Sequence, residues 1–72
     1  MQDKLIEITK QFTDKDINNN SHYIDDLDFD SLTVIEYIMK LEDEFNIEIS
    51  DDEVSKLYRI EDALELLQRK VK

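Results

Sequence analysis

The sequence predicts an all-α fold, a four-helix bundle built from three longer helices and one short helix. Apolar residues recur every three or four positions over most of the chain, which is the spacing of one face of a helix. Residues with helix-capping ability stand where that spacing begins or stops. The 72 residues leave room for one small core. We therefore expect a single domain over residues 1–72, too small to enclose a buried enzyme pocket.

The first helix is expected over residues 3–12, where Leu5, Ile8 and Phe12 have helical spacing. The chain has no glycine and no proline, so its turns must come from Asn, Asp and Ser. Residues 13–20 form such a loop, because Asn and Asp side chains compete for backbone hydrogen bonds. Four apolar residues are expected to hold this linker and its continuation on the core: Ile17, Tyr23, Ile24 and Leu27.

The second helix is expected over residues 31–45, with cap candidates at Asp30 and Ser31 and a left-handed end at Asn46. It carries two apolar stripes, and so small a domain cannot easily bury both. One stripe has the spacing of a core face: Val34, Tyr37, Ile38, Leu41 and Phe45. The other lies well over 90° away on the helix, by the 100° turn per residue. It consists of Leu32, Ile35 and Met39, bordered by the acids Glu36, Glu42 and Asp43.

The short helix is expected over residues 51–57, because Ser50 and Glu53 form a capping-box pattern. The last helix is expected over residues 60–71, with acidic residues first and basic residues last, as the helix dipole favours. Its apolar positions are Ile60, Leu64, Leu67 and Val71.

Charge is concentrated in the middle of the chain. The net charge is −10, and residues 25–53 hold twelve acids against one base, Lys40, which is a net −11. Such a surface favours a basic protein partner and disfavours nucleic acid or an anionic membrane, although a simple solubility role would also explain it. The chain has no cysteine, so any thiol chemistry must be brought from outside, and its start lacks the pattern of a secretory signal. We expect a cytoplasmic protein.

Ser31 stands at the start of the acidic second helix, where position alone favours a capping role. A calcium loop is disfavoured: Asp26, Asp28 and Asp30 alternate, but Ser31 stands where glycine is needed and Tyr37 where glutamate is needed. A serine hydrolase is also disfavoured. The only histidine, His22, is expected to be an exposed loop residue, and a nucleophile elbow needs glycine.

The order of residues around Ser31 resembles the modification site of acyl carrier proteins. The run from Asp25 to Leu32 is similar to that family's acidic-Leu-Gly-x-Asp-Ser-Leu segment, and Asp30-Ser31-Leu32 matches its centre. The resemblance continues without gaps through Glu36, Met39, Leu41, Glu42, Glu44, Phe45, Glu48 and Ile49. It then covers the expected third and fourth helices, and so nearly the whole chain.

The resemblance implies a carrier, not an enzyme, with 4'-phosphopantetheine attached to Ser31 by a phosphopantetheinyl transferase and acyl groups held on the arm as thioesters. Asp30 would position the attachment point. Acyl-loading and condensing enzymes with basic faces would dock on Leu32, Ile35, Glu36, Met39, Glu42 and Asp43. We expect a monomeric carrier of fatty-acid or polyketide-type biosynthesis. The alternatives are a discrete aminoacyl or peptidyl carrier and, in another class, an acidic helical adaptor without a prosthetic group.

The chain departs from the family pattern at several positions. Asp28 replaces the usual glycine and Phe29 a frequently small residue, so we expect an altered backbone before Ser31 and an effect on transferase choice. Ser50 replaces a common proline, and neither Tyr58 nor Arg59 is a good cap for the last helix.

Overall fold

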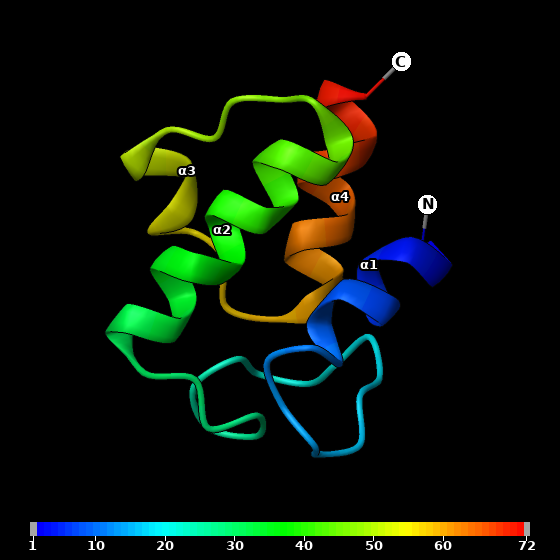
Figure 1. Cartoon of the computed structure of the whole chain (residues 1–72), viewed down its shortest axis with the longest axis vertical. Coiled ribbons are helices and arrows are strands. Elements are labelled where there is room, and N and C mark those ends of the chain that lie inside the picture. The colour runs from blue at the N-terminus through cyan, green and yellow to red at the C-terminus, as the bar shows by residue number, and fades with distance from the viewer. Residues whose placement is uncertain (1, 72) are drawn as a thin grey trace.

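The computed structural model describes residues 2–71 and confirms the all-α fold. Its four helices are α1 (Gln2–Thr9), α2 (Ser31–Phe45), α3 (Asp51–Val54) and α4 (Ile60–Lys70). Figure 1 shows α2 crossing the molecule in front of α4, with the long α1–α2 loop gathered at one end. None of the described helices is long and apolar enough to cross a membrane.

The expected helix α2 is confirmed at both ends. The carboxylate of Asp30 accepts a hydrogen bond from the backbone N–H of Thr33, and Asn46 ends the helix with φ 55°. Asn is one of the few residues other than glycine that tolerates this left-handed conformation. The capping box of α3 is also present, because Ser50 and Glu53 exchange their side-chain-to-backbone hydrogen bonds.

Three helices are shorter than expected. The helix expected over 3–12 ends at Thr9, because the chain tightens into turns in which Gln11 donates to the carbonyl of Ile8 and Phe12 to that of Thr9. The short helix ends at Val54 instead of residue 57, and the last helix ends at Lys70 with Val71 as its cap.

The core gathers side chains from α1, α2, α4 and the long loop. The expected stripe of α2 faces inward, with Tyr37, Ile38 and Leu41 buried and Val34 and Phe45 at its margin. The inward face of α4 differs from the expected one. Ala63 and Leu66 are buried with Ile60 and Leu67, whereas Leu64 and Val71 are only partly covered.

Helix α1 holds the C-terminal end of α2. The two helices pack together, and the ammonium group of Lys4 donates to the backbone carbonyl of Glu44 at 3.1 Å. The same group lies 5.2 Å from the centre of the Phe45 ring. With this end fixed by α1 and the other preceded by the long loop, α2 presents its first turn and outer face to solvent.

Candidate functional site

Ser31 is the first residue of α2 and is exposed to solvent. Of the two cap candidates, the structure uses Asp30, whose Oδ1 accepts from the Thr33 N–H at 2.8 Å and whose carbonyl accepts from Val34 at 2.9 Å. The capping role that position alone favoured for Ser31 is therefore filled by its neighbour. The Ser31 hydroxyl is left available for chemistry.

A comparison of the four serines supports this availability. The Ser21 hydroxyl accepts from the backbone of Asn18, and Ser50 forms the α3 capping box. The Ser55 hydroxyl donates to a carbonyl in α3 at 2.7 Å. Within residues 2–71, the Ser31 hydroxyl is the one serine hydroxyl that has no hydrogen bond to another protein group. Its position at a helix start is thus not explained by a structural bond.

Asp30 remains an anion beside Ser31. The hydrogen bond from the backbone of Thr33 lowers the pKa of the Asp30 carboxyl below its ordinary value of 3.8, because it stabilises the charged form. Asp30 is exposed, so its carboxylate is accessible to a partner that approaches Ser31.

The two departures before Ser31 have different structural consequences. Asp28 has φ 60°, in the left-handed region that favours glycine, and Asp is one of the residues that accept it. Phe29 is buried, and its backbone N–H donates to the carbonyl of Tyr23 at 2.9 Å. Phe29 therefore fixes the segment before Ser31 on the core instead of leaving it loose.

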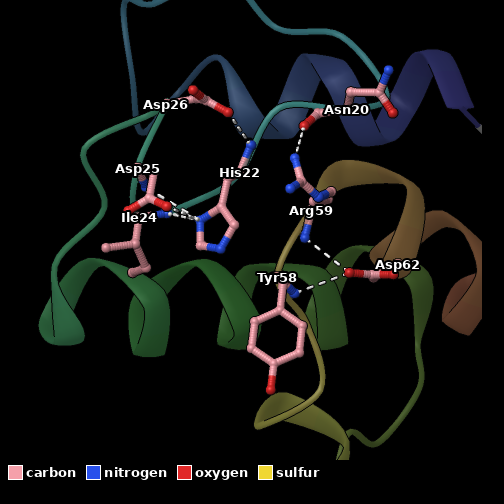
Figure 2. Close-up of polar contacts among 8 residues, drawn as sticks. All are labelled: Asn20, His22, Ile24, Asp25, Asp26, Tyr58, Arg59 and Asp62. Carbon is pink, nitrogen blue, oxygen red and sulfur yellow. Dashed lines mark hydrogen bonds and ion pairs between the residues drawn. The ribbon is translucent and has the colours of Figure 1, made fainter.

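His22 shapes the turn that leads to this segment, as Figure 2 shows. Its Nδ1 accepts from the backbone N–H groups of Ile24 and Asp25, both at 3.2 Å, and the backbone N–H of His22 donates to the Asp26 carboxylate at 2.7 Å. The expectation of an exposed histidine is wrong: its side chain is only 20% exposed. The centre of its ring lies 6.2 Å from that of Tyr58, and the two rings are tilted by 32°. With Nδ1 committed to the backbone, His22 has a structural role in the loop.

The loop is also tied to the start of α4. The backbone N–H of Tyr23 donates to the carbonyl of Tyr58 at 2.9 Å. Figure 2 shows the second contact, in which the Arg59 guanidinium donates to the carbonyl of Asn20 at 2.7 Å. Neither Tyr58 nor Arg59 caps α4 with its side chain. The Asp62 carboxylate instead accepts from both of their backbone N–H groups, at 3.1 and 3.0 Å. These contacts fix the loop, and with it the start of α2.

The outer stripe of α2 faces solvent as expected. Leu32, Ile35 and Met39 are 65%, 57% and 62% exposed. Glu36 and Asp43 are exposed beside them, but Glu42 is partly buried and one of its carboxylate oxygens accepts from the backbone of Ile49 at 2.9 Å. Glu42 thus also holds the α2–α3 connection, a role that the sequence pattern did not indicate.

Two further apolar side chains, Ile24 and Tyr58, are exposed on the segments that flank His22. Ile24 was expected to hold the linker on the core, and this expectation is wrong. Its neighbour Tyr23 is buried, whereas Ile24 lies in the turn over residues 23–27, where its backbone N–H donates to His22 Nδ1 and its side chain faces solvent. Within residues 2–71, no three His, Cys, Asp or Glu side chains gather as a candidate metal site.

Comparison with known proteins gives a consistent result. Residues 2–67 match the family described as the phosphopantetheine attachment site. An acyl carrier protein of Buchnera aphidicola is 46% identical over 54 residues, which cover 75% of this chain and 68% of that protein. One of Lactobacillus acidophilus is 45% identical over 56 residues, covering 76% and 70%. A solved structure from Mycobacterium tuberculosis, assigned as an acyl carrier protein, superposes with a TM-score of 0.88 at 30% identity, covering 94% of this chain and 95% of that one.

Proposed function

We propose that Ser31 is the attachment residue of this chain. The chain belongs to the phosphopantetheine-attachment family of acyl carrier proteins. The protein is a carrier and not a catalyst, and its prosthetic group is 4'-phosphopantetheine. One observation carries the assignment of Ser31: its hydroxyl is exposed at the start of α2 and is free of the capping role, which Asp30 fills.

The residues at the start of α2 fit a phosphopantetheine group. Attachment needs an accessible hydroxyl, whose oxygen bonds to the phosphorus that carries pantetheine in coenzyme A while the pyrophosphate bond breaks, so that the nucleotide leaves and the hydroxyl gives up its proton. Ser31 meets this need without loss of a structural contact. When bound, the group supplies the thiol that this cysteine-free chain lacks. The positive end of the α2 dipole favours a phosphate at this position. Asp30 keeps that helix end ordered by holding the Thr33 N–H.

We also propose that the transferase and the acyl-transfer enzymes dock on an outer face of α2, which consists of Leu32, Ile35 and Met39 with the acids Glu36, Glu42 and Asp43. Three exposed apolar side chains on one stripe cost solubility, and a partner that covers them would gain apolar contact. The acids at their edge would attract a basic partner and speed the encounter. Because Glu42 is partly engaged by Ile49, Glu36 and Asp43 contribute most of this attraction.

The carrier acts as a monomer in the cytoplasm in this proposal. Partners would meet the outer face of α2 in succession, so that face must remain uncovered between encounters. An acidic adaptor without a prosthetic group would use the same face. It would have no need for the free Ser31 hydroxyl.

The test of Ser31 is labelling with coenzyme A and a broad-specificity phosphopantetheinyl transferase, followed by intact mass. We expect one addition to the wild type and none to Ser31→Ala, with unchanged circular dichroism. Ser55→Ala is the matched control, since Ser55 is also an exposed serine next to a helix, and it should be labelled normally. Failure of the wild type under conditions that label a known carrier would contradict the assignment and favour the adaptor.

The test of docking is charge reversal on the outer face of α2. Glu36→Lys with Asp43→Lys should slow labelling, mainly through association, and should remove most of its salt dependence. The control reverses two exposed acids elsewhere, Glu7 on α1 and Glu65 on α4, which gives the same net charge. Equal labelling rates at low salt for the two double variants would exclude this face as the docking surface.

A further inference from the structure

Four aromatic rings fill the core next to the start of α2. The Phe29 ring lies 5.4 Å from that of Tyr23 and 5.3 Å from that of Tyr37, between ring centres. Phe12 closes the cluster at 5.6 Å from Tyr37 and 6.3 Å from Phe29. These distances are those of rings in direct contact. Because Phe29 precedes Ser31 by two residues, the part of the core nearest to the attachment point along the chain is occupied by the protein's own side chains.

A chain of hydroxyl groups runs through the same cluster. The Tyr23 hydroxyl lies 2.8 Å from that of Tyr37, which lies 2.9 Å from that of Thr9. The Thr9 hydroxyl then donates to the backbone carbonyl of Leu5 at 2.7 Å. Within residues 2–71, no buried side-chain nitrogen or oxygen lacks a hydrogen-bond partner. Burial raises the pKa of the Tyr23 and Tyr37 hydroxyls, as expected for groups held away from water.

A long alkyl chain attached through Ser31 would leave water if the protein offered it apolar space. Entry into this cluster would displace packed rings, and cores resist added volume. It would also separate hydroxyl groups that satisfy one another, which leaves buried polar atoms unpaired. The groove between α3 and α4, of about 370 Å³, does not suit alkyl either. Five of its seven lining residues are charged: Glu53, Lys56, Leu57, Asp62, Glu65, Leu66 and Arg69.

We infer, on the basis of the attachment proposed at Ser31, that this carrier holds short or polar acyl groups outside its core and does not bury long alkyl chains. Phe29 and Tyr37 determine this preference. Their two rings occupy the space within the aromatic cluster, and the Tyr37 hydroxyl is the central one of the hydroxyl chain. Cargo held outside remains exposed to water, which suits acyl groups that are short or hydrogen-bond with water.

The test compares carriers loaded from butanoyl-, octanoyl- and dodecanoyl-coenzyme A by a transferase. The ring proton resonances of Tyr23, Phe29 and Tyr37 and the urea unfolding midpoint are measured for each form. We expect the same ring resonances and the same midpoint in all three. Ring resonances that shift progressively with chain length, together with a rising midpoint, would overturn the inference. Failure to load any of the three would instead count against Ser31 as the attachment site, so the two proposals fail separately.

A second comparison uses Phe29→Ala, which opens space inside the aromatic cluster. In this variant the dodecanoyl form should have a higher urea midpoint than the butanoyl form, a difference that the wild type lacks. An equal rise in both proteins, or no rise in the variant, would overturn the role assigned to Phe29. If the variant does not fold, the wild-type series still decides whether long chains enter the core.

Discussion

Leu41 and Met39 lie two residues apart on α2 but on opposite sides of the boundary between core and solvent. Leu41 is 1% exposed and Met39 is 62% exposed. Truncation of Leu41 to Ala should cost ~2–5 kcal/mol, because the whole side chain is lost from a packed core. Most of the Met39 side chain is already in water, so Met39→Ala should change stability by about 0.5 kcal/mol or less.

The expected loss of unfolding free energy in Leu41→Ala is large for so small a protein. At roughly 0.05–0.15 kcal/mol per residue, a chain of this length has a total stability of about 4–11 kcal/mol. Leu41→Ala therefore removes a major share of it. The assay is urea unfolding followed by far-ultraviolet circular dichroism with linear extrapolation.

Leu41→Met is the matched control for this experiment. It nearly conserves volume and should cost less than about 1.5 kcal/mol. Comparable losses for Met39→Ala and Leu41→Ala would show that the two faces of α2 are assigned wrongly, and the proposed docking surface would then fail with them.

Three further outcomes are expected from the same unfolding assay. Asp28→Gly should raise stability by up to about 1 kcal/mol, because glycine has no Cβ to oppose φ 60°, and Asp28→Val should lower it. The lowered pKa of Asp30 means that its carboxylate stabilises the fold above the unfolded value near 3.8 and loses that effect as pH falls through the folded pKa. Asp30→Asn keeps the acceptor but cannot titrate, so its urea midpoint should fall less than that of wild type between pH 5 and about pH 2. Tyr37→Phe should cost ~1–3 kcal/mol by leaving Thr9 and Tyr23 without a shared partner, whereas Tyr58→Phe, at an exposed ring, should cost almost nothing. An unchanged midpoint in Tyr37→Phe would contradict the importance of the buried hydroxyl chain.

Helix α2 could be predicted to the residue because local signals fix both of its ends. Asp30 caps the first turn with its own side chain, and Asn46 takes the left-handed conformation that ends the last turn. Its two apolar stripes were also readable, since their separation on a helix follows from spacing alone. The candidate site benefits from this, because Ser31 and the outer face both belong to α2.

The start of α4 shows where sequence patterns fail. Tyr58 and Arg59 offer no side-chain acceptor, and the cap is supplied from inside the helix by Asp62. From the sequence, the acids in the first turn of α4 are expected only to interact with the helix dipole. Asp62 can accept from the backbone before α4 only because of the position of residues 58 and 59. That position is set by long-range contacts with Asn20 and Tyr23.

The loop before Ser31 depends on tertiary contacts that spacing does not encode. The polar residues around His22 predict a side chain in solvent, but its ring lies next to that of Tyr58, which comes from a distant part of the chain. The sequence shows Phe29 only as a large residue at a position where the family often has a small one. Its burial depends on Phe12, Tyr23 and Tyr37, which come from three separate segments. The contacts among these four rings therefore could not be predicted from the spacing of residues along the chain.

The decisive measurement on Ser31 is peptide fragmentation of the wild-type chain after co-expression with a phosphopantetheinyl transferase. Mass spectrometry locates the arm on one residue among four serines, of which Ser21, Ser50 and Ser55 have engaged hydroxyls. We predict that the added mass lies on Ser31 alone and that the arm then accepts an acyl group as a thioester cleaved by hydroxylamine. A chain that stays unmodified beside a labelled control carrier, or that carries the arm on another serine, would contradict the assignment.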